Sequence, residues 1–535
     1  MKTLLTGAVI LVALFAGAAK AEIPVDAQGK PNIGIGGVDD TYSRVLKLYV
    51  TGSSSINMLL ERMLTARWLP PHPYPLGNLC LPNSKVYKYQ DNDSGKNQNA
   101  YLCAINRFNP SLRSHDNRKD YLLVYTRSLG ETVSGVKSVV SNLPVRFLRI
   151  DEHGMTYPNQ RCSAPVAGSM FFPVRLSSNY DNYLTNFSYR VKEWVRNLNT
   201  TSPNPNVLTL TCRYDELGNS ILARPDFAVS DYRLPLGLLT FAEMQRIYTI
   251  YTKPIGIQVF GVVLNTAFRD ALQNVQFPAA ACKLVGGAVN GRESLACMPT
   301  LTKTQITNLI RVGVAASVPG SRLPALPGAA NLHACGGTNN SGAKAVTAKR
   351  VCQAVGVPDC QGSKPTTVAS KSRYHEMPTA SGVAECLSEL NQGVDILGSS
   401  FTMSGTPKWA IGYQSTFNIN FPEIFRNDIY TRQGGKYTTG QYRFIKVDGL
   451  EPTTLNAVWP KTHPYTDWEV ALCYIKNRPL ISENKRLLIA SICSQIKPDS
   501  YFTNSSGTLY SALLVLPVLF PPRLTKYAWG VAGFL

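Results

Sequence analysis

The sequence of 535 residues has few charged side chains, and acidic residues are the scarcer kind. Only 16% of the residues are charged, with 34 Asp and Glu against 54 Lys and Arg, so the formal net charge is +20. Soluble domains usually carry about 25% charged residues, so we expect a cationic surface rich in uncharged polar groups. Apolar residues make up 44% of the chain, which excludes a disordered protein and suffices for one large or two medium cores.

Motifs of common enzymes and metal sites are also missing. The chain has no G-x-S-x-G turn, no Walker loop and no C-x-x-C pair, and none of its six histidines lies four residues from another. His375-Glu376 begins like a zinc-protease helix, but Thr379 stands where the second histidine is needed and Pro378 would interrupt the helix. The sequence therefore indicates no catalytic residue, no metal ligand and no cofactor, and the histidines are interpreted as surface or packing residues. A secreted hydrolase, whose catalytic residues would meet only in space, is the third alternative for the function.

The first 21 residues have the pattern of a secretory signal peptide. Lys2 is followed by an apolar stretch from residue 4 to about residue 18, and the tripeptide Ala-Lys-Ala at 19–21 fits a cleavage site after Ala21. A membrane anchor is the alternative, although the apolar stretch is short for a span. Loss of Lys2 and Lys20 leaves the mature chain with a net charge of +18, and we expect it in the periplasm or in the extracellular space.

The rest of the chain has one further strongly apolar run, Ala512–Phe520, which Pro517 interrupts. A transmembrane helix needs about 20 consecutive apolar residues. We therefore expect no transmembrane span in the mature chain.

All twelve cysteines follow the predicted cleavage site, and their number is even. In an exported chain this pattern predicts up to six disulfides, while the pairing stays open. Sequence neighbours are candidates for local bridges, among them Cys282 with Cys297 and Cys352 with Cys360. Cys80 and Cys103 lie at the two ends of a polar segment. A disulfide between them would close this segment as a surface loop.

The basic charge alone is compatible with a nucleic acid, an anionic lipid, a cell-wall polymer or small anions as partners. The positive residues are scattered singly, and no ladder of aromatic residues accompanies them. We interpret them as a solvated cationic surface and expect no nucleic-acid partner.

Short β-rich runs alternate with helical patterns along the chain. Three such pairs are Leu46–Thr51 with Ile56–Arg67, Tyr121–Tyr125 with Ser134–Val140, and Gln258–Val263 with Phe268–Leu272. Their alternation predicts an α/β fold. Polar or Pro- and Gly-rich stretches between the units are interpreted as long insertions, at Leu69–Gln98, Asn199–Asn206, Val318–Ala345 and Asp359–Ser372.

Turns rich in Gly and Ser lie where predicted strands lead into helices, at Thr51–Ser55 and Thr132–Gly135. The first N–H groups of a helix have no partner within the helix and can bind an anion. These turns are therefore candidate ligand loops.

Taken in order, these and later segments resemble motifs of the phosphate-binding receptors of ABC transporters, members of the type 2 periplasmic-binding-protein family. The segment Asp226–Asp231, DFAVSD, is similar to the family's DFGASD and is the most specific match. The other matching segments are Leu48–Ser55, Tyr125–Lys137, Gly261–Asn265, Leu301–Ile306, Thr338–Gly342, Trp409–Tyr413 and Tyr442–Gly449. The resemblance spans about residues 45 to 450.

The resemblance implies a two-lobed α/β fold with long disulfide-tied loop insertions. Lobe one would comprise residues 45–238 and 412–530, and lobe two residues 239–411. It also implies a non-enzymatic solute-binding protein that closes on a small oxyanion such as phosphate and works with an ABC permease. The implied ligand-binding residues are Ser55, Ser134, Ser230, Asp231, Ser341 and Gly342.

Two positions depart from the family pattern. Gly337 stands where the family has an arginine four residues before the serine of its anion loop, and Ala343 replaces the threonine after Ser-Gly. An arginine would give a bidentate contact to phosphate, so these departures imply weaker phosphate binding or another ligand. The alternative is an extracellular structural or surface-interaction protein that retains a vestigial binding-protein fold.

Overall fold

The structure of the protein is a computed structural model, and it describes a defined subset of the chain. The described residues are 25, 31, 45–53, 60, 64, 79–81, 84–91, 98–107, 112, 119–129, 131–150, 162, 166–167, 206–214, 220–232, 234, 239–247, 250–277, 297–312, 332–338, 341–355, 374–377, 380–393, 407–415, 442–452, 468–477, 479–495 and 513–514. The predicted signal peptide at 1–21 and the candidate residue Ser55 lie outside them.

A first group of strands forms around β1 (Val45–Gly52), which pairs in parallel with β4 (Tyr121–Arg127) and with β9 (Phe227–Ser230). The sheet continues from β4 through β3 (Gln98–Ala104), β2 (Val86–Asp91), β7 (Val207–Cys212) and β6 (Val166–Ala167). A small sheet of β5 (Val145–Leu148) and β8 (Ser220–Ala223) stands beside it. Most residues of β1 and β4 are buried and apolar or aromatic, as expected for strands covered on both faces.

A second group forms around β12 (Leu332–Gly337), which pairs in parallel with β13 (Tyr374–Met377) and β14 (Trp409–Ser415). Four helices accompany these strands: α8 (Thr266–Gln276), α9 (Lys303–Val312), α10 (Gly342–Thr347) and α12 (Ala380–Gln392). A π-helical turn at Ala348–Cys352 and a 3-10 turn at Gln353–Val355 continue α10. The remaining short strands here are β11 (Thr300–Leu301), β15 (Tyr442–Phe444) and β16 (Lys446–Val447).

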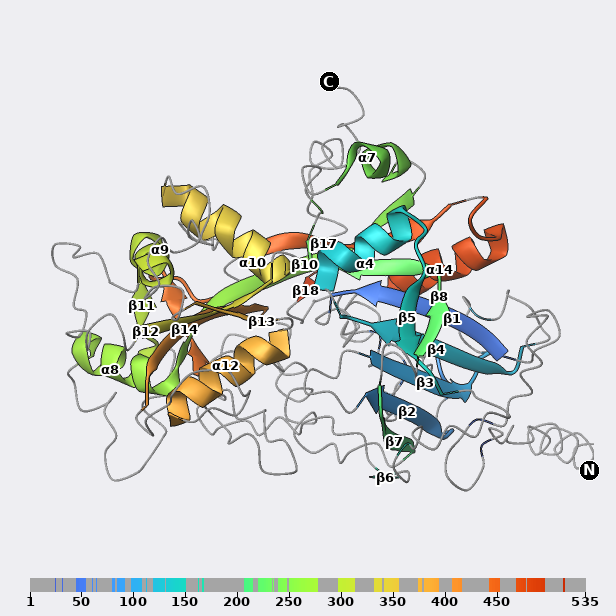
Figure 1. The fold of residues 1–535 in the computed structure, drawn as a ribbon, viewed down its shortest axis with the longest axis horizontal. Coiled ribbons are helices and arrows are strands. Elements are labelled where there is room, and N and C mark those ends of the chain that lie inside the picture. Colours follow the sequence, from blue (N-terminus) through green and yellow to red (C-terminus); the bar gives the residue numbers. More distant parts are fainter. Residues whose placement is uncertain are drawn as a thin grey trace, which may run out of the picture.

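The long strand β10 (Ile250–Asn265) connects the two groups, which lie side by side in Figure 1. Its N-terminal part pairs with β17 (Trp468–Lys476), which also pairs with β9 of the first group. Its C-terminal part pairs with β14 and β15 of the second group, and β18 (Leu513–Leu514) pairs near its middle. The register shifts between Pro254 and Gly256, where the proline has no N–H to donate to the ladder.

The alternation of strands and helices predicted from the sequence is confirmed, and the fold is α/β. The predicted strand Leu46–Thr51 lies in β1, and Tyr121–Tyr125 lies in β4. Of the predicted helix at 56–67, Leu60 and Leu64 are described, and both are helical and buried. The helix predicted at Ser134–Val140 begins three residues earlier, as α4 (Glu131–Val140).

The core is divided among several apolar clusters, one of which joins the two groups. That cluster combines Val136 of α4, Ala228 of β9, Phe260 of β10 and Val346 of α10, all nearly or fully buried. Because α4 and β9 belong to the first group and α10 to the second, the apolar contact continues across the junction.

Two further helices lie in the first group. The helix α7 (Phe241–Ile247) begins with a capping box, in which Thr240 N–H donates to Glu243 and Glu243 N–H donates to the Thr240 hydroxyl. The helix α14 (Glu483–Gln495) packs on β17 and is tied to it by the bridge Cys473–Cys493.

Disulfides join elements in both groups, as the even cysteine count predicts. Besides Cys473–Cys493, the bridges are Cys80–Cys103, Cys162–Cys212 and Cys335–Cys386. Cys297 and Cys352 are also disulfide-bonded. The bridge Cys80–Cys103 is as predicted, but the segment it closes is not a surface loop, because β2 within it is largely buried and pairs with β3 and β7.

Within the described part of the chain, no helix is both long and apolar enough to cross a membrane.

Candidate functional site

The carboxyl ends of the parallel strands in both groups meet near the middle of β10. In the first group, Ser230 at the end of β9 pairs with Leu472 of β17, and Leu472 pairs with Pro254 of β10. In the second group, Ser415 at the end of β14 pairs with Phe260 of β10. Ligands of α/β proteins bind outside the carboxyl ends of parallel strands, so this junction is where a site is expected.

Asp231 lies at this junction, directly after β9, and its side chain is buried. Ser53, which follows β1, donates its hydroxyl to Oδ2 of Asp231 at 2.9 Å. Thr132, in the first turn of α4, donates its hydroxyl to Oδ1 at 2.6 Å. One carboxylate thus accepts a hydrogen bond from each of two neighbouring segments.

The pKa of Asp231 lies above its ordinary value. Burial disfavours the charged carboxylate and raises the pKa, and this effect exceeds the opposite effect of the hydrogen bonds from Thr132, Ser53 and the backbone of Asp231 itself. A carboxylate in this state readily shares a proton with an acidic group placed next to it.

The second group brings Gly342, the first residue of α10, against this carboxylate. A β-carbon added to Gly342 would lie 2.1 Å from Oδ1 of Asp231, so only glycine leaves room for the contact. Ser341 is the N-cap of α10, and its hydroxyl oxygen accepts from the N–H of Lys344 at 3.4 Å. Ser53, Thr132 and Asp231 of the first group therefore meet Ser341-Gly342 of the second.

Close backbone contacts fix the position of the two hydroxyl donors. Gly52 has φ +123°, and a β-carbon there would lie 1.9 Å from the carbonyl oxygen of Val229. Gly135 of α4 packs on Gly52 so closely that a β-carbon would lie 2.4 Å from its nitrogen. These contacts hold the ends of β1 and β9 against the first turns of α4. Ser53 and Thr132 lie in this region, so their hydroxyls are positioned beside Asp231.

Of the residues implied by the resemblance, Asp231, Ser341 and Gly342 come together at the junction. Ser134 lies half-buried in α4. The hydroxyl of Ser230 is engaged within its own turn, where it donates to the carbonyl of Tyr232 and accepts from the N–H of Tyr232 at 3.3 Å. Ser55 lies outside the described residues.

The sequence interpretation missed Ser53 and Thr132, the two hydroxyl donors to Asp231. Both lie in the segments singled out as candidate loops, Thr51–Ser55 and Thr132–Gly135, so the loops were found and the contacting residues were not. The helix was predicted to begin at Ser134, and the earlier start of α4 puts Thr132 in its first turn instead.

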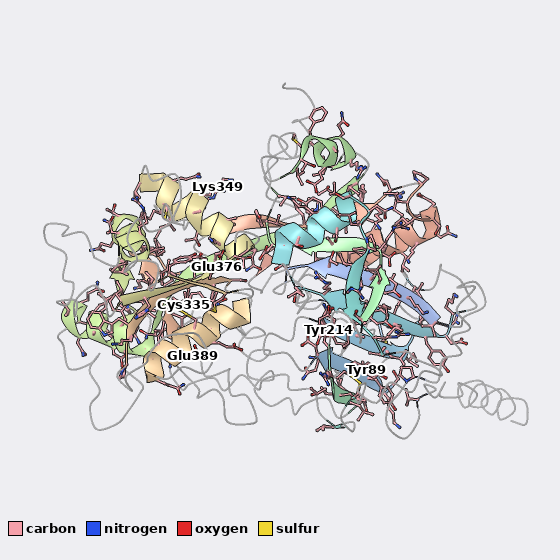
Figure 2. All side chains as sticks on the ribbon, in the orientation of Figure 1. Tyr89, Tyr214, Cys335, Lys349, Glu376 and Glu389 are labelled. Atoms are coloured by element: carbon pink, nitrogen blue, oxygen red, sulfur yellow. A yellow bond between two sulfur atoms is a disulfide. The ribbon has the colours of Figure 1, made fainter. Side chains whose placement is uncertain are left out.

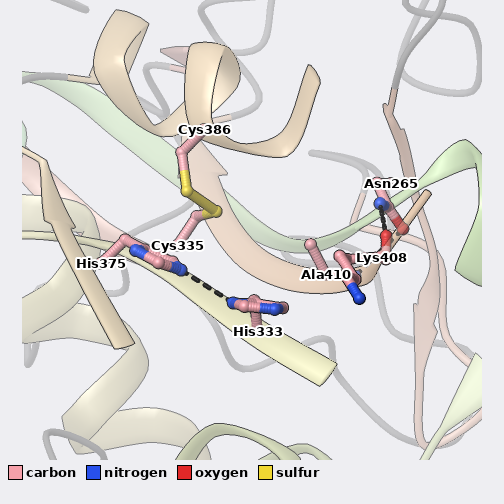
Figure 3. The surroundings of a disulfide bond; sticks show 7 residues. All are labelled: Asn265, His333, Cys335, His375, Cys386, Lys408 and Ala410. Carbon is pink, nitrogen blue, oxygen red and sulfur yellow. Dashed lines mark hydrogen bonds between the residues drawn. A yellow bond between two sulfur atoms is a disulfide. The ribbon is translucent and has the colours of Figure 1, made fainter. Parts of the chain in front are cut away.

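Two histidines of the second group form a buried pair beside the Cys335–Cys386 bridge (Figure 3). Nδ1 of His333 on β12 and Nε2 of His375 on β13 lie 2.9 Å apart, and the rings are stacked. Burial, together with the neighbouring His333, lowers the pKa of His375 to about 3. Among the described residues, no group of three or more His, Cys, Asp or Glu could hold a metal ion, and the two histidines stack on each other.

Comparisons with known proteins identify neighbours only at the level of three-dimensional structure. No family model and no curated protein matches the chain. Thirteen chains of solved structures match. A protein assigned as a phosphate ABC transporter substrate-binding protein from Clostridium perfringens, with bound phosphate, is 15% identical over 52% of this chain and 76% of that chain, with a TM-score of 0.27.

Two further neighbours have similar descriptions. An ABC-type phosphate transport receptor from Vibrio cholerae is 12% identical over 50% of this chain and 73% of that chain, with a TM-score of 0.25. PstS from Borrelia burgdorferi is 8% identical over 83% of this chain and 92% of that chain, with a TM-score of 0.28. At this level of similarity, the function has to be argued from the contacts in this chain.

Proposed function

We propose that the protein is a solute-binding protein that closes on a small oxyanion carrying an acidic hydrogen, with hydrogen phosphate as the model ligand. The observation that carries this proposal is the buried carboxylate of Asp231, which receives hydroxyl groups from Ser53 and Thr132 and touches Gly342 across the junction. Donors and an acceptor from separate segments converge here, as the recognition of a small polar ligand requires.

Asp231 accepts the acidic hydrogen of the ligand in this proposal. Its pKa is raised by burial, so the ligand and the carboxylate share a proton instead of repelling each other as two full negative charges. The hydroxyls of Ser53 and Thr132 rotate from the carboxylate to the ligand oxygens, since a hydroxyl can donate in either direction. Ser341 and the backbone N–H of Gly342 complete the site from the second group.

The two groups of elements correspond to two lobes in this proposal. The resemblance implies lobe one at 45–238 and 412–530 and lobe two at 239–411. The groups differ from these bounds, because α7 lies in the first group and β15 and β16 lie in the second. The strand β10 is the main crossing. Opening and closing around the crossing admit and enclose the ligand. The disulfides, the predicted signal peptide and the resemblance support an exported, non-enzymatic receptor that works with an ABC permease.

The alternative, a structural or surface-interaction protein with a vestigial site, is favoured by one observation. The carboxylate of Asp231 already contacts Gly342, so the junction is closed by the protein's own side chain. Gly337, at the end of β12, supplies no side-chain charge to compensate that carboxylate. In this alternative the contact holds the two groups together and binds nothing.

Isothermal titration calorimetry of the mature protein with phosphate, sulfate and organic anions separates the two functions. A receptor should bind phosphate, and Asp231→Asn should weaken phosphate binding more than sulfate binding, because sulfate carries no acidic hydrogen at neutral pH. Asp448→Asn is the matched control, since Asp448 is exposed and lies at a surface ion pair with Lys303. Absence of binding to any anion would support the structural alternative.

A further inference from the structure

The helix α10, which begins at the candidate site with Gly342, also carries a buried ammonium. The side chain of Lys344 is 4% exposed, and the residue lies two positions after Gly342 on α10. Its Nζ is 3.4 Å from Oε1 of Glu376 on β13 and 5.5 Å from the centre of the Tyr374 ring. Figure 2 labels Glu376 beside α10. A buried charge is tolerated only with such partners.

The two members of this ion pair differ sharply in exposure. The side chain of Glu376 is 51% exposed, whereas that of Lys344 is enclosed. The glutamate can therefore turn into water without disturbing the packing, while the ammonium stays in place. An incoming anion can therefore take the place of the glutamate and keep the buried ammonium paired with a negative charge.

Polar groups extend this environment along the end of β12. The hydroxyls of Tyr374 and Tyr413 lie 3.2 Å apart. A β-carbon on Gly336 would lie 2.3 Å from the Tyr374 hydroxyl and 2.6 Å from that of Tyr413, so the absence of a side chain lets both reach the strand. With Gly337 following, β12 ends on two residues without side chains.

We propose that Lys344 is the cationic ligand-binding residue of the site, and that Glu376 is an internal counter-ion which the anionic ligand displaces. This inference rests on the proposed function and goes beyond it by assigning the positive charge that the ligand meets. Lysine presents a compact point charge without the two-pronged geometry of arginine. The site therefore selects negative charge through Lys344 and the acidic hydrogen through Asp231, from opposite groups.

The test measures phosphate binding by calorimetry at low and at moderate salt. Lys344→Met removes the charge and keeps the length of the side chain, and it should weaken binding about 10- to 100-fold, the loss of a hydrogen bond to a charged group. Glu376→Gln removes the competitor and should strengthen binding up to about fivefold. Both effects should persist at moderate salt, because a desolvated contact is screened less than a surface charge.

A second lysine–glutamate pair of the same group provides the control. Lys446 and Glu451 lie 3.3 Å apart, so Lys446→Met and Glu451→Gln change the net charge equally at another pair. Both control variants should bind phosphate like the parent. A loss for Lys446→Met equal to that for Lys344→Met would mean that overall charge governs binding, and it would overturn the proposal.

The remaining outcomes are also decisive. Parent-like binding by Lys344→Met refutes the role of Lys344 and leaves the proposed function standing. Weaker binding by Glu376→Gln shows a purely structural ion pair and overturns the proposal, and this exposed substitution gives a result even where Lys344→Met fails to fold. Absence of phosphate binding in both the parent and Glu376→Gln refutes the proposed function and this inference together.

Discussion

The carboxylate of Asp231 occupies the space in which a β-carbon of residue 342 would lie. The distance from Oδ1 of Asp231 to that position is 2.1 Å, far below any contact that two such atoms can make. Asp231 directly follows β9 in the first group, and Gly342 begins α10 in the second. The closed junction therefore depends on a residue without a side chain at position 342.

Gly342→Ala should destabilise the protein through this contact. The added methyl must displace the carboxylate that Ser53 and Thr132 hold, and overpacking of this kind costs about 1–3 kcal/mol. Chemical unfolding of the parent, Gly342→Ala, Asp231→Ala and the double variant gives a double-mutant cycle. The double variant should be more stable than the sum of the single effects predicts, because the clash is absent when Asp231 is truncated. Additive effects would show that the two residues do not contact each other.

Gly135→Ala should be more damaging than Gly342→Ala. The nearest atoms to its added β-carbon are the nitrogen and Cα of Gly52, at 2.4 and 2.5 Å, and these backbone atoms cannot rotate away as a carboxylate can. The start of α4 would have to move off β1, taking Thr132 from Asp231. We expect a loss of about 3 kcal/mol or more in the free energy of unfolding, at the upper end of overpacking costs, measured by denaturant titration. An equal or smaller loss than for Gly342→Ala would contradict the close packing of α4 on β1.

The sequence predicted the strands that carry the site better than the contacts within it. The β-rich runs at 46–51 and 121–125 are visible because buried parallel strands are apolar along their length. By contrast, β10 runs for 16 residues through Pro254, although an internal proline usually indicates an edge or an interruption. The strand continues because its N-terminal part pairs with β17 and its C-terminal part pairs with β14 and β15. The residues of β10 alone do not indicate these partners.

In the candidate site too, features of a single segment were predicted, and contacts between distant segments were not. The motif at 226–231 identified Asp231, since a carboxylate after a buried strand stands out in one segment. The contacts of Asp231 with Ser53, Thr132 and Gly342 join distant segments, and a run of three serines at 53–55 does not indicate which hydroxyl reaches the carboxylate. Lys344 and Glu376 meet only because β13 lies beside β12, so no sequence spacing pointed to the pair.

The bridge Cys335–Cys386 should contribute more stability than Cys473–Cys493. Its cysteines are 51 residues apart in the sequence, against 20 for the other pair, and a longer closed loop restricts the unfolded chain more. All four cysteines are buried, so replacing each pair by alanines leaves comparable gaps. We expect a loss of about 2–5 kcal/mol for either double variant, with the Cys335/Cys386 variant lower by roughly 1 kcal/mol in chemical unfolding. The reverse order would show that native-state strain or packing outweighs loop closure.

The buried histidine pair should make the stability of the protein depend on pH. His375 has its pKa lowered from 6.5 to about 3 by burial and by the neighbouring His333, so the folded protein keeps this ring neutral in a range where the unfolded chain protonates it. The full stability is therefore present above about pH 6.5, and it is lost progressively as the pH falls from there towards 3. Between pH 7.5 and pH 5 the loss from His375 should be on the order of 2 kcal/mol.

His375→Gln isolates this contribution, because the glutamine amide can donate to or accept from Nδ1 of His333 and has no charge to gain. The free energy of unfolding of the parent and the variant, measured at pH 7.5 and pH 5, should converge at the lower pH. His333, the ring in direct contact with His375, is present in both proteins, so the difference between them reports the charging of His375 together with its effect on His333. If the parent and His375→Gln lose equal stability between the two pH values, His375 is not the group whose protonation opposes folding.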